Sequence, residues 1–537
     1  MKKILIIAIV FVAVGGWLFS QYWYYLPGII SSIVSPVGEH QEVSWLRGPA
    51  VAIEENRPPN VVLIVVDDLG FNDITFYGGG IAEGTVPTPN IDSIAAEGIH
   101  FTNGYAGNGT CAPSRAALLT GRFATRSGFE FTPARPEFAQ LTAGDGYLAE
   151  NAENYPPSES LGLPGSELTL PELLKARGYH SVALGKWHLG EAEGYRPLDQ
   201  GFDEFLGFLP GAALFLPEDH ENTVNSKQDF DPIDRFLWPN LSYAVRHNNS
   251  ARFEPDSHMT DYFSRHAAQV IEANRNRPFF LYLAYNAPHT PLQSEKKDYD
   301  ALAHIPNHIE RTYAGMLRGL DRGIGQVLDA LEANGVADNT IVIFTSDNGG
   351  AGYVGLPDLN KPYRGWKISF FEGGIHTPYF IRWPDRIPGG SQYDSAVAHI
   401  DIFSTVLAAA DVPRPTDRVI DGVDVLEYAL SNPRPMDRPL FWRSGGYKVV
   451  LQDGWKLQRQ EQNGKVWLYN LNLDPTEQTN LSKTHPDRLA ELTAVLNKLD
   501  GQMEEPLWPA LVETPIAIDH TINNLPDGEY ETILWNN

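Results

Sequence analysis

A continuously apolar, β-branched run, Val61–Val66, restricts the fold of this chain more than any other feature. Both faces of such a strand must be buried, because no polar side chain alternates with the apolar ones. Similar runs follow at Ser181–Leu184, Phe279–Tyr285 and Thr340–Thr345. Helical patterns separate these runs, and that alternation is typical of a large, mostly parallel sheet with helices on both faces. The sequence therefore predicts an α/β fold.

The clearest helical pattern runs from His308 to Asn334. Its apolar side chains recur every three or four residues and fall on one face, and Gly335 ends the helix. A shorter helix begins at Thr88-Pro89, with proline in its first turn, and Gly98 closes it. Helices of this kind would cover the predicted sheet.

The pattern of predicted secondary structure changes near residue 430. Strands that alternate in polarity are punctuated by Asp453-Gly454 and Asn463-Gly464, which are hairpin turns, and a helix follows from Pro486 to Leu499. We therefore expect a catalytic domain over residues 58–430 and a smaller antiparallel subdomain with its tail over residues 431–537. At 537 residues the chain is long enough for both units.

The N-terminus predicts an association with a membrane. Lys2 and Lys3 precede an apolar run from Ile4 to Phe19, and no other charge occurs before Glu39. A retained signal anchor (residues 1–25) and a cleaved signal peptide both fit. We favour the anchor, because an aromatic cluster extends the run and no Ala-x-Ala site follows it. The body would then lie on the periplasmic or extracytoplasmic side, with residues 26–57 as a stalk or lead-in; secretion after cleavage is the alternative.

Composition narrows the possible partners. The chain has 41 basic and 67 acidic residues, a net charge of −26, which argues against a nucleic-acid partner. The net negative charge repels an anionic substrate, so binding one would require a local pocket of positive charge. The single cysteine excludes an intrachain disulfide.

Polar clusters directly follow the four buried strands. They are Asp67-Asp68, Gly185-Lys186-Trp187-His188, Pro288-His289-Thr290-Pro291 and Asp347-Asn348-Gly349-Gly350. Ligands of open α/β sheets bind at the carboxyl ends of the strands, so we expect these clusters to meet in one crevice.

Two of the clusters predict a metal site. Asp67, Asp68, Asp347 and Asn348 supply only hard oxygen ligands. This chemistry suits Ca²⁺, with Mg²⁺ as the alternative, better than zinc. Adjacent acids also repel each other, and a cation between them relieves the repulsion.

The only cysteine, Cys111, begins the run Cys-Ala-Pro-Ser-Arg-Ala-Ala-Leu-Leu-Thr-Gly-Arg over residues 111–122. This run resembles the signature of type I, arylsulfatase-like sulfatases of the alkaline phosphatase superfamily. In that family a formylglycine-generating enzyme oxidises the cysteine to formylglycine, whose hydrate attacks sulfur and later expels sulfate. The resemblance extends from about Pro59 to Asp474-Pro475.

The resemblance implies a role for each polar cluster. Its metal ligands fall on Asp67, Asp68, Asp347 and Asn348, with the modified Cys111 also touching the cation. Its catalytic residues fall on Cys111, Arg115, Lys186, His188, His289 and Lys367. Every one of these positions carries the expected residue type. One departure is His376, where many members carry arginine.

We therefore expect a sulfuric ester hydrolase. Three alternatives remain: a phosphodiester or phosphonate monoester hydrolase of the same superfamily, an inactive domain that binds sulfated glycans, and a cysteine hydrolase. The last requires a histidine-activated thiolate, which the acidic cluster does not call for.

The organic part of the substrate, a small molecule or a carbohydrate, is left open by the sequence. Loops over residues 131–166 and 209–255 could determine specificity or could simply cover the surface. They carry Tyr147, Phe215, Phe230, Arg235, Trp238, Arg246 and His247. By position alone, Arg364 and His376 could bind a second sulfate or a carboxylate.

Overall fold

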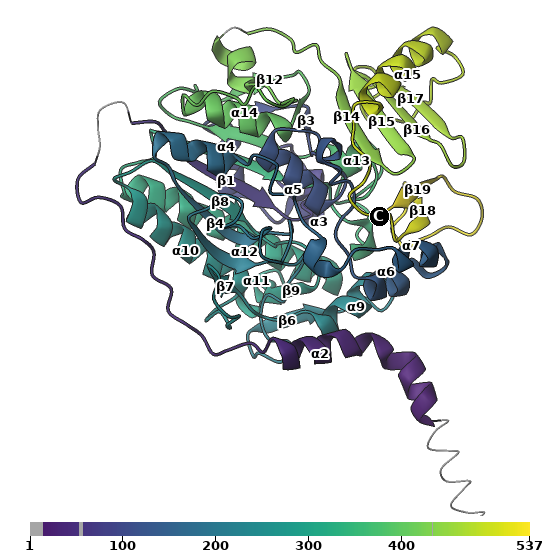
Figure 1. Ribbon diagram of the computed structural model, residues 1–537, viewed down its shortest axis with the longest axis horizontal. Coiled ribbons are helices and arrows are strands. Elements are labelled where there is room, and N and C mark those ends of the chain that lie inside the picture. Colours follow the sequence, from purple (N-terminus) through teal and green to yellow (C-terminus); the bar gives the residue numbers. More distant parts are fainter. Residues whose placement is uncertain (1–13, 53–56, 432) are drawn as a thin grey trace, which may run out of the picture.

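The computed structural model describes residues 14–52, 57–431 and 433–537, and a nine-stranded sheet forms its centre (Figure 1). Across the sheet, the strands are β12 (Ser391–Tyr393), β2 (Ile99–Phe101), β11 (Tyr379–Arg382), β10 (Thr340–Ser346), β1 (Asn60–Val66), β8 (Phe279–Ala284), β4 (His180–Lys186), β5 (Glu204–Phe208) and β7 (Arg246–His247).

The four strands predicted from the sequence lie side by side in the order β10, β1, β8 and β4. All three pairings among them are parallel. Val65 of β1, for example, is level with Thr345 of β10 and Ala284 of β8. Their carboxyl ends therefore share one edge of the sheet, and the predicted fold class is confirmed.

Helices cover both faces of the sheet. Val61, Leu63 and Val65 of β1 pack in one core with helices α5 and α14, whereas Val62 and Ile64 pack in the other with α4, α10 and α12. This alternation explains why β1 is apolar at every position. The helices are α4 (Pro89–Ala96), α5 (Cys111–Thr120), α10 (Met259–Asn274), α12 (His308–Ala333) and α14 (Ile400–Ala409).

Shorter elements connect these layers. The helices are α3 (Ile81–Gly84), α6 (Pro136–Ala143), α7 (Ala149–Glu153), α8 (Leu170–Leu174), α11 (Lys296–Asp300) and α13 (Glu372–Ile375). The strands β3 (Gly104–Tyr105) and β13 (Val397–Ala398) pair with each other, as do β6 (Thr223–Ser226) and β9 (Leu292–Glu295).

The C-terminal part forms an antiparallel sheet of β14 (Leu440–Ser444), β15 (Tyr447–Gln452), β16 (Trp455–Gln460) and β17 (Val466–Asn470), followed by α15 (Pro486–Asp500). The hairpin turns after β15 and β16 lie where the sequence predicts them, whereas β14 was not predicted. A last hairpin, β18 (Glu513–Ala517) and β19 (Thr532–Asn536), forms in the tail, where we predicted no strands. Apolar residues of this sheet share a core with one face of the large sheet.

The N-terminal helix α2 (Leu26–Val34) lies along the surface of α9 (Pro232–Asn240) (Figure 1). The Asn240 amide donates a hydrogen bond to the Tyr24 carbonyl at 2.9 Å. Downstream, Trp45 is buried and donates to His266 Nδ1 at 3.3 Å. The lead-in therefore runs against the catalytic body rather than away from it.

Within residues 14–52, 57–431 and 433–537, the structure contains no helix that is both long and apolar enough to cross a membrane. The first half of the predicted anchor, residues 1–13, lies outside the described residues.

Candidate active site

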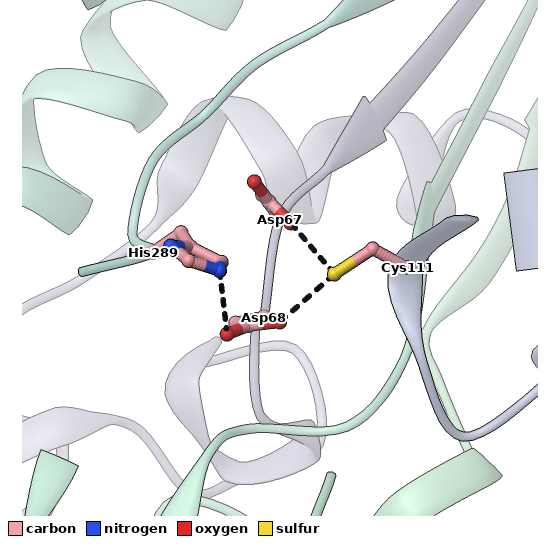
Figure 2. A group of neighbouring side chains, drawn as sticks. All are labelled: Asp67, Asp68, Cys111 and His289. Atoms are coloured by element: carbon pink, nitrogen blue, oxygen red, sulfur yellow. Dashed lines mark hydrogen bonds and ion pairs between the residues drawn. The ribbon is translucent and has the colours of Figure 1, made fainter. Parts of the chain in front are cut away.

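The predicted site residues meet where the central strands end. Asp67 and Asp68 follow β1, and Cys111 is the first residue of α5. Figure 2 shows the two carboxylates between the Cys111 thiol and the His289 ring. The ligand atoms of these four residues all lie within 4.8 Å of one another. Four more predicted residues come from strands of the same sheet: Lys186 at the end of β4, His188 just beyond it, and Asp347 and Asn348 after β10.

The thiol lies against the acidic cluster. Cys111 Sγ is 3.6 Å from Asp67 Oδ1 and 3.9 Å from Asp68 Oδ1, and its side chain is buried. Because α5 begins at this residue, the positive end of the helix dipole favours negative charge there. The position suits a group that becomes anionic during a reaction.

The donor set fits a divalent cation with a preference for oxygen ligands. Asp67, Asp68, Asp347 and Asn348 are all at most 3% exposed. Asn348 donates through Nδ2 to Asp68 Oδ1 at 2.8 Å, yet its buried Oδ1 has no partner among the described residues. An orphaned amide oxygen beside three carboxylates is the ligand that Ca²⁺ or Mg²⁺ would take up.

Arg115 neutralises part of this acidic cluster. It is fully buried one turn into α5, and its Nε and Nη2 donate to Asp347 Oδ2 at 2.9 and 2.7 Å. Its Nη2 also lies 3.5 Å from Asp67 Oδ1. Burial by itself would raise the pKa of Asp347, but Arg115 and then Lys186 lower it to about 2. Asp347 is therefore held as a carboxylate.

Each of the two adjacent acids pairs with its own lysine. Lys186 Nζ donates to Asp67 Oδ1 and Oδ2 at 2.8 and 2.7 Å. Lys367 Nζ lies 2.7 Å from Asp68 Oδ1 and 2.8 Å from Oδ2. Burial alone would lower the pKa of Lys367, but Asp68 raises it well above its usual value, so the ammonium is retained.

The two histidines occupy different surroundings. His289 Nε2 lies 3.6 Å from Asp68 Oδ2, and its Nδ1 lies 2.6 Å from the Thr290 carbonyl. His188 Nδ1 is buried without a partner among the described residues. Burial lowers the pKa of both imidazoles, and in His188 the charges of Lys186 and Arg115 lower it further. A neutral His188 is able to accept a proton.

The backbone is strained at three positions in this site. Asp68, His188 and Ile368, which follows Lys367, have φ of 63°, 61° and 73°. Left-handed conformations of residues other than glycine cost about 1–3 kcal/mol each and tend to occur at functional sites. Here they fix the directions of two polar side chains and of the loop that carries Lys367.

One residue of the site, Tyr353, was not among the residues predicted from the sequence. Its hydroxyl donates to Asp68 Oδ2 at 2.9 Å and accepts from Lys367 Nζ at 3.0 Å. Tyr353 lies in a short 3₁₀ helix, Gly352–Val354, rather than at the end of a strand, and no motif includes it. Only the tertiary structure brings this phenol to the site.

Two residues that could have bound a second anion instead pair with the protein's own acids. Arg364 donates to Asp519 Oδ1 at 3.0 Å and to Glu531 Oε2 at 2.8 Å. His376 is buried, with Nδ1 2.7 Å from Glu372 Oε2. Neither side chain is available to a substrate, so this interpretation of the sequence is wrong.

The aromatic residues of the predicted specificity loops divide between core and surface. Phe215 is 1% exposed and Trp238 is 8% exposed, with its Nε1 donating to Asp234 Oδ2 at 2.8 Å. Phe230, in contrast, is 37% exposed. Phe215 and Trp238 therefore stabilise the fold rather than contact a ligand.

Comparison with known proteins defines the class. The family model described as Sulfatase matches residues 59–412. The chain therefore belongs to the sulfatase family and is an enzyme that hydrolyses sulfate esters. It is 37% identical over 396 residues to N-acetylgalactosamine-6-sulfatase of Homo sapiens, covering 72% of this chain and 69% of the relative. It is 30% identical over 494 residues to steryl-sulfatase of Rattus norvegicus, covering 80% of each.

Solved structures agree with this assignment. The crystal structure of Ps i-CgsB in complex with k-i-k-neocarrahexaose superimposes with a TM-score of 0.71 at 30% sequence identity. The alignment covers 84% of this chain and 95% of that chain. The predictions of an arylsulfatase-like family, of its fold and of an enzyme are thereby confirmed.

Proposed function

We propose that this sulfatase cleaves its ester with a formylglycine made from Cys111 and with one divalent cation, Ca²⁺ in preference to Mg²⁺. The observation that carries the proposal is the position of the Cys111 thiol. It lies 3.6 and 3.9 Å from two carboxylates at the start of a helix, with Arg115 inside the same cluster. A formylglycine-generating enzyme is the partner that this maturation requires.

Asp67, Asp68, Asp347 and Asn348 would hold the cation, together with residue 111. A cation there would stabilise negative charge on the ester oxygens as an electrophile. The oxygen-only donors and the unpartnered Asn348 Oδ1 support Ca²⁺ or Mg²⁺ over zinc. The two charged hydrogen bonds that Arg115 donates to Asp347 Oδ2 keep this carboxylate ionised and oriented.

Formylglycine supplies a hydrated aldehyde, one hydroxyl of which attacks sulfur while the other later expels sulfate. The chain's own groups manage charge and protons around it. Lys186 and Lys367 lie beside the acids as fixed cations, where the ester's negative charge develops. Although burial lowers the pKa of His289, the neighbouring Asp68 and Asp67 carboxylates favour its protonated form. In that form His289, assisted by Lys367, would donate a proton to the departing oxygen. His188, which its low pKa keeps neutral at the start of this step, would accept the proton of the second hydroxyl.

We infer that the substrate is a sulfated carbohydrate. One relative is named N-acetylgalactosamine-6-sulfatase, and the structural neighbour was solved with a neocarrahexaose. The relative named steryl-sulfatase keeps a small apolar substrate as the alternative.

We also propose that the N-terminal segment attaches the enzyme to a membrane, with the catalytic domain on the extracytoplasmic side. Helical residues 14–34 expose large apolar side chains, among them Trp17, Phe19, Ile29 and Ile33, at 51–74%. Fractionation of cells expressing the full chain tests this proposal: retention in membranes after a high-salt wash supports an anchor, and release supports the secreted alternative.

The mechanism is tested first by the mass of the peptide containing Cys111 from protein made in its native host. A mass of the aldehyde or its hydrate supports formylglycine, and an unmodified thiol in active protein would overturn it. Release of inorganic sulfate is then measured across aryl sulfates and sulfated sugars, with matched aryl phosphonates beside them. Faster cleavage of the phosphonates would favour the phosphonate hydrolase instead. A Cys111→Ala variant should lose turnover and keep the fold.

A further inference from the structure

Two arginines face each other across a short hairpin at the edge of the large sheet. Val245 and Phe253 form an antiparallel bridge, with both backbone hydrogen bonds at 2.9 Å. The next residues along the two strands, Arg246 and Arg252, are therefore directly opposite each other. Cβ atoms of such a pair lie about 4.5–5.5 Å apart, and like charges there destabilise a sheet.

Neither Arg246 nor Arg252 forms an ion pair with an acid within the described part of the chain. Arg246 Nη1 donates to the Ser250 carbonyl at 2.9 Å, and Arg252 Nη1 donates to Ser242 Oγ at 3.3 Å. Arg252 Nη2 donates to the Ser35 carbonyl at the end of α2. These partners are neutral, and no carboxylate of the described residues forms an ion pair with either guanidinium.

Two more arginines, which form no ion pair among the residues that the structure describes, complete the cluster. Arg196 Nε donates to the Glu191 carbonyl at 2.9 Å. Arg135 precedes α6 and lines a cavity together with Ser35, the residue whose carbonyl accepts from Arg252. Burial lowers the pKa of Arg246, and the charges of Arg196 and Arg252 lower it further. The positive charges of all four arginines lower the pKa of the Glu191 carboxyl, against burial, which raises it. Glu191 nevertheless forms no ion pair with any of them within the described chain. Four guanidiniums around one acid leave a net positive charge.

The cluster lies close to the reaction centre. Arg246 is level with Gly207 of β5, and Gly207 is level with Gly185 of β4, the residue before Lys186. Two strand spacings correspond to about 10 Å. Glu191 is three residues beyond His188, and three residues span at most about 11 Å. An oligosaccharide could reach both places at once.

A cluster of positive charge is unexpected on a molecule whose net charge is strongly negative. With a net charge of −26, the surface repels a polyanion. A purely structural hairpin would gain stability from an acid opposite Arg246, and this one has arginine there. The repulsion between Arg246 and Arg252 would be relieved if a bound anionic ligand supplied the missing negative charge.

We propose that Arg135, Arg196, Arg246 and Arg252 form a second anion-binding subsite. It binds a sulfate or carboxylate on a sugar other than the one being desulfated. The inference rests on the proposed carbohydrate substrate and extends it: the preferred substrate is an oligosaccharide with more than one negative charge.

The test measures binding of a fluorescein-labelled heparin hexasaccharide to the full-length, metal-loaded protein by fluorescence anisotropy. The variant is Arg246→Gln/Arg252→Gln. The matched control is Arg386→Gln, an exposed arginine that follows β11 on the far side of the sheet. Its guanidinium lies 5.7 Å from the centroid of the Trp383 ring and forms no ion pair within the described residues. We expect Kd to rise roughly tenfold or more in the double variant and to stay unchanged in the control. A hyaluronan hexasaccharide, which has carboxylates but no sulfates, distinguishes the two anions.

A second measurement shows whether the bound hexasaccharide occupies the substrate cleft. It should inhibit sulfate release competitively, and the inhibition should weaken in the double variant. An unchanged Kd with unchanged thermal stability would overturn the proposal, as would non-competitive inhibition. Loss of binding to phosphatidylglycerol vesicles, with hexasaccharide binding retained, would assign the cluster to a membrane surface instead. Failure of the proposed function would appear separately, as no sulfate release by the wild type.

Discussion

The hydroxyl group of Tyr353 connects Asp68, an acid of the proposed metal site, to Lys367. Its bonds to Asp68 and Lys367 measure 2.9 and 3.0 Å. Outer partners of ligating carboxylates typically contribute 10–100-fold in metal affinity. We therefore expect Tyr353→Phe to bind Ca²⁺ roughly tenfold more weakly in calorimetric titrations of chelator-treated protein.

Tyr379→Phe is the matched control for that measurement, because the buried Tyr379 hydroxyl has no partner among the described residues. Its Ca²⁺ affinity should equal that of the wild type. Equal affinities in both variants would show that the Tyr353 hydroxyl only fills space.

Asp73 makes stability depend on pH. Burial raises the pKa of its carboxyl from the usual 3.8 to about 7, against hydrogen bonds from Tyr313 and Gly70. Between these values the folded chain keeps a proton that the unfolded chain has lost. The stabilisation is therefore full below pH 4 and is lost as the pH rises through 7. Relative to Asp73→Asn, the wild type should lose about 1.4 kcal/mol per pH unit in this window.

Urea unfolding of both proteins at pH 5, 6, 7 and 8, with saturating Ca²⁺, measures this difference. A difference in the free energy of unfolding that stays constant with pH would contradict the prediction. Asp73 serves this purpose because it lies outside the metal cluster and its partners are neutral groups.

At the scale of elements, the buried Lys456 side chain links strand β16 to the segment that follows the active-site Lys367. Lys456 Nζ lies 2.7 Å from Glu372 Oε1 and 3.0 Å from Glu477 Oε1, and all three side chains are buried. Glu372 begins α13, five residues after Lys367. Removing one partner of a buried ion pair typically costs about 3–5 kcal/mol. We expect Lys456→Met to lose that much free energy of unfolding in urea titrations and to lower kcat.

The control is Lys296→Met, because Lys296 and its partner Asp300 are 53% and 54% exposed. Exposed pairs contribute about 0–1 kcal/mol, so this variant should behave like the wild type. Adding Glu477→Gln to Lys456→Met should recover part of the loss, since it removes one uncompensated carboxylate. No recovery would mean that packing, rather than charge, holds the two parts together.

At the scale of the whole molecule, the cation should stabilise the folded state. Asp67, Asp68 and Asp347 come from two strands that are far apart in sequence, and a bound ion would link them. Ligand binding at 100 times Kd stabilises by about 2.7 kcal/mol. We therefore expect EDTA to lower Tm and added Ca²⁺ to restore it in calorimetric scans.

Mg²⁺ at equal concentration should restore Tm less, because flexible oxygen-rich sites favour Ca²⁺. An unchanged Tm after chelation and dialysis would contradict a cation site. Restoration by Zn²⁺ alone would contradict the assignment to a hard cation.

The sequence by itself predicted the central sheet, the long helix α12 and the residues that meet at the carboxyl edge. These features are local: Val61–Val66 is apolar at every position, and polar residues directly follow each strand. The motif that begins at Cys111 likewise carries its information within a dozen residues. The edge strands β5 and β7 were missed, as were β14 and the hairpin of β18 and β19, because their pairing depends on distant partners.

Only the tertiary structure decided which polar residues are free to act. In the folded protein Arg364 and His376 pair with the protein's own acids, and the Tyr353 hydroxyl bonds to Asp68. Arg246 lies opposite Arg252, and neither forms an ion pair with an acid of the described residues. Whether a charge is paired depends on side chains far away in sequence, because the energy of an ion pair depends on distance and burial. A local pattern specifies which groups are present, and the folded arrangement determines what each of them contacts.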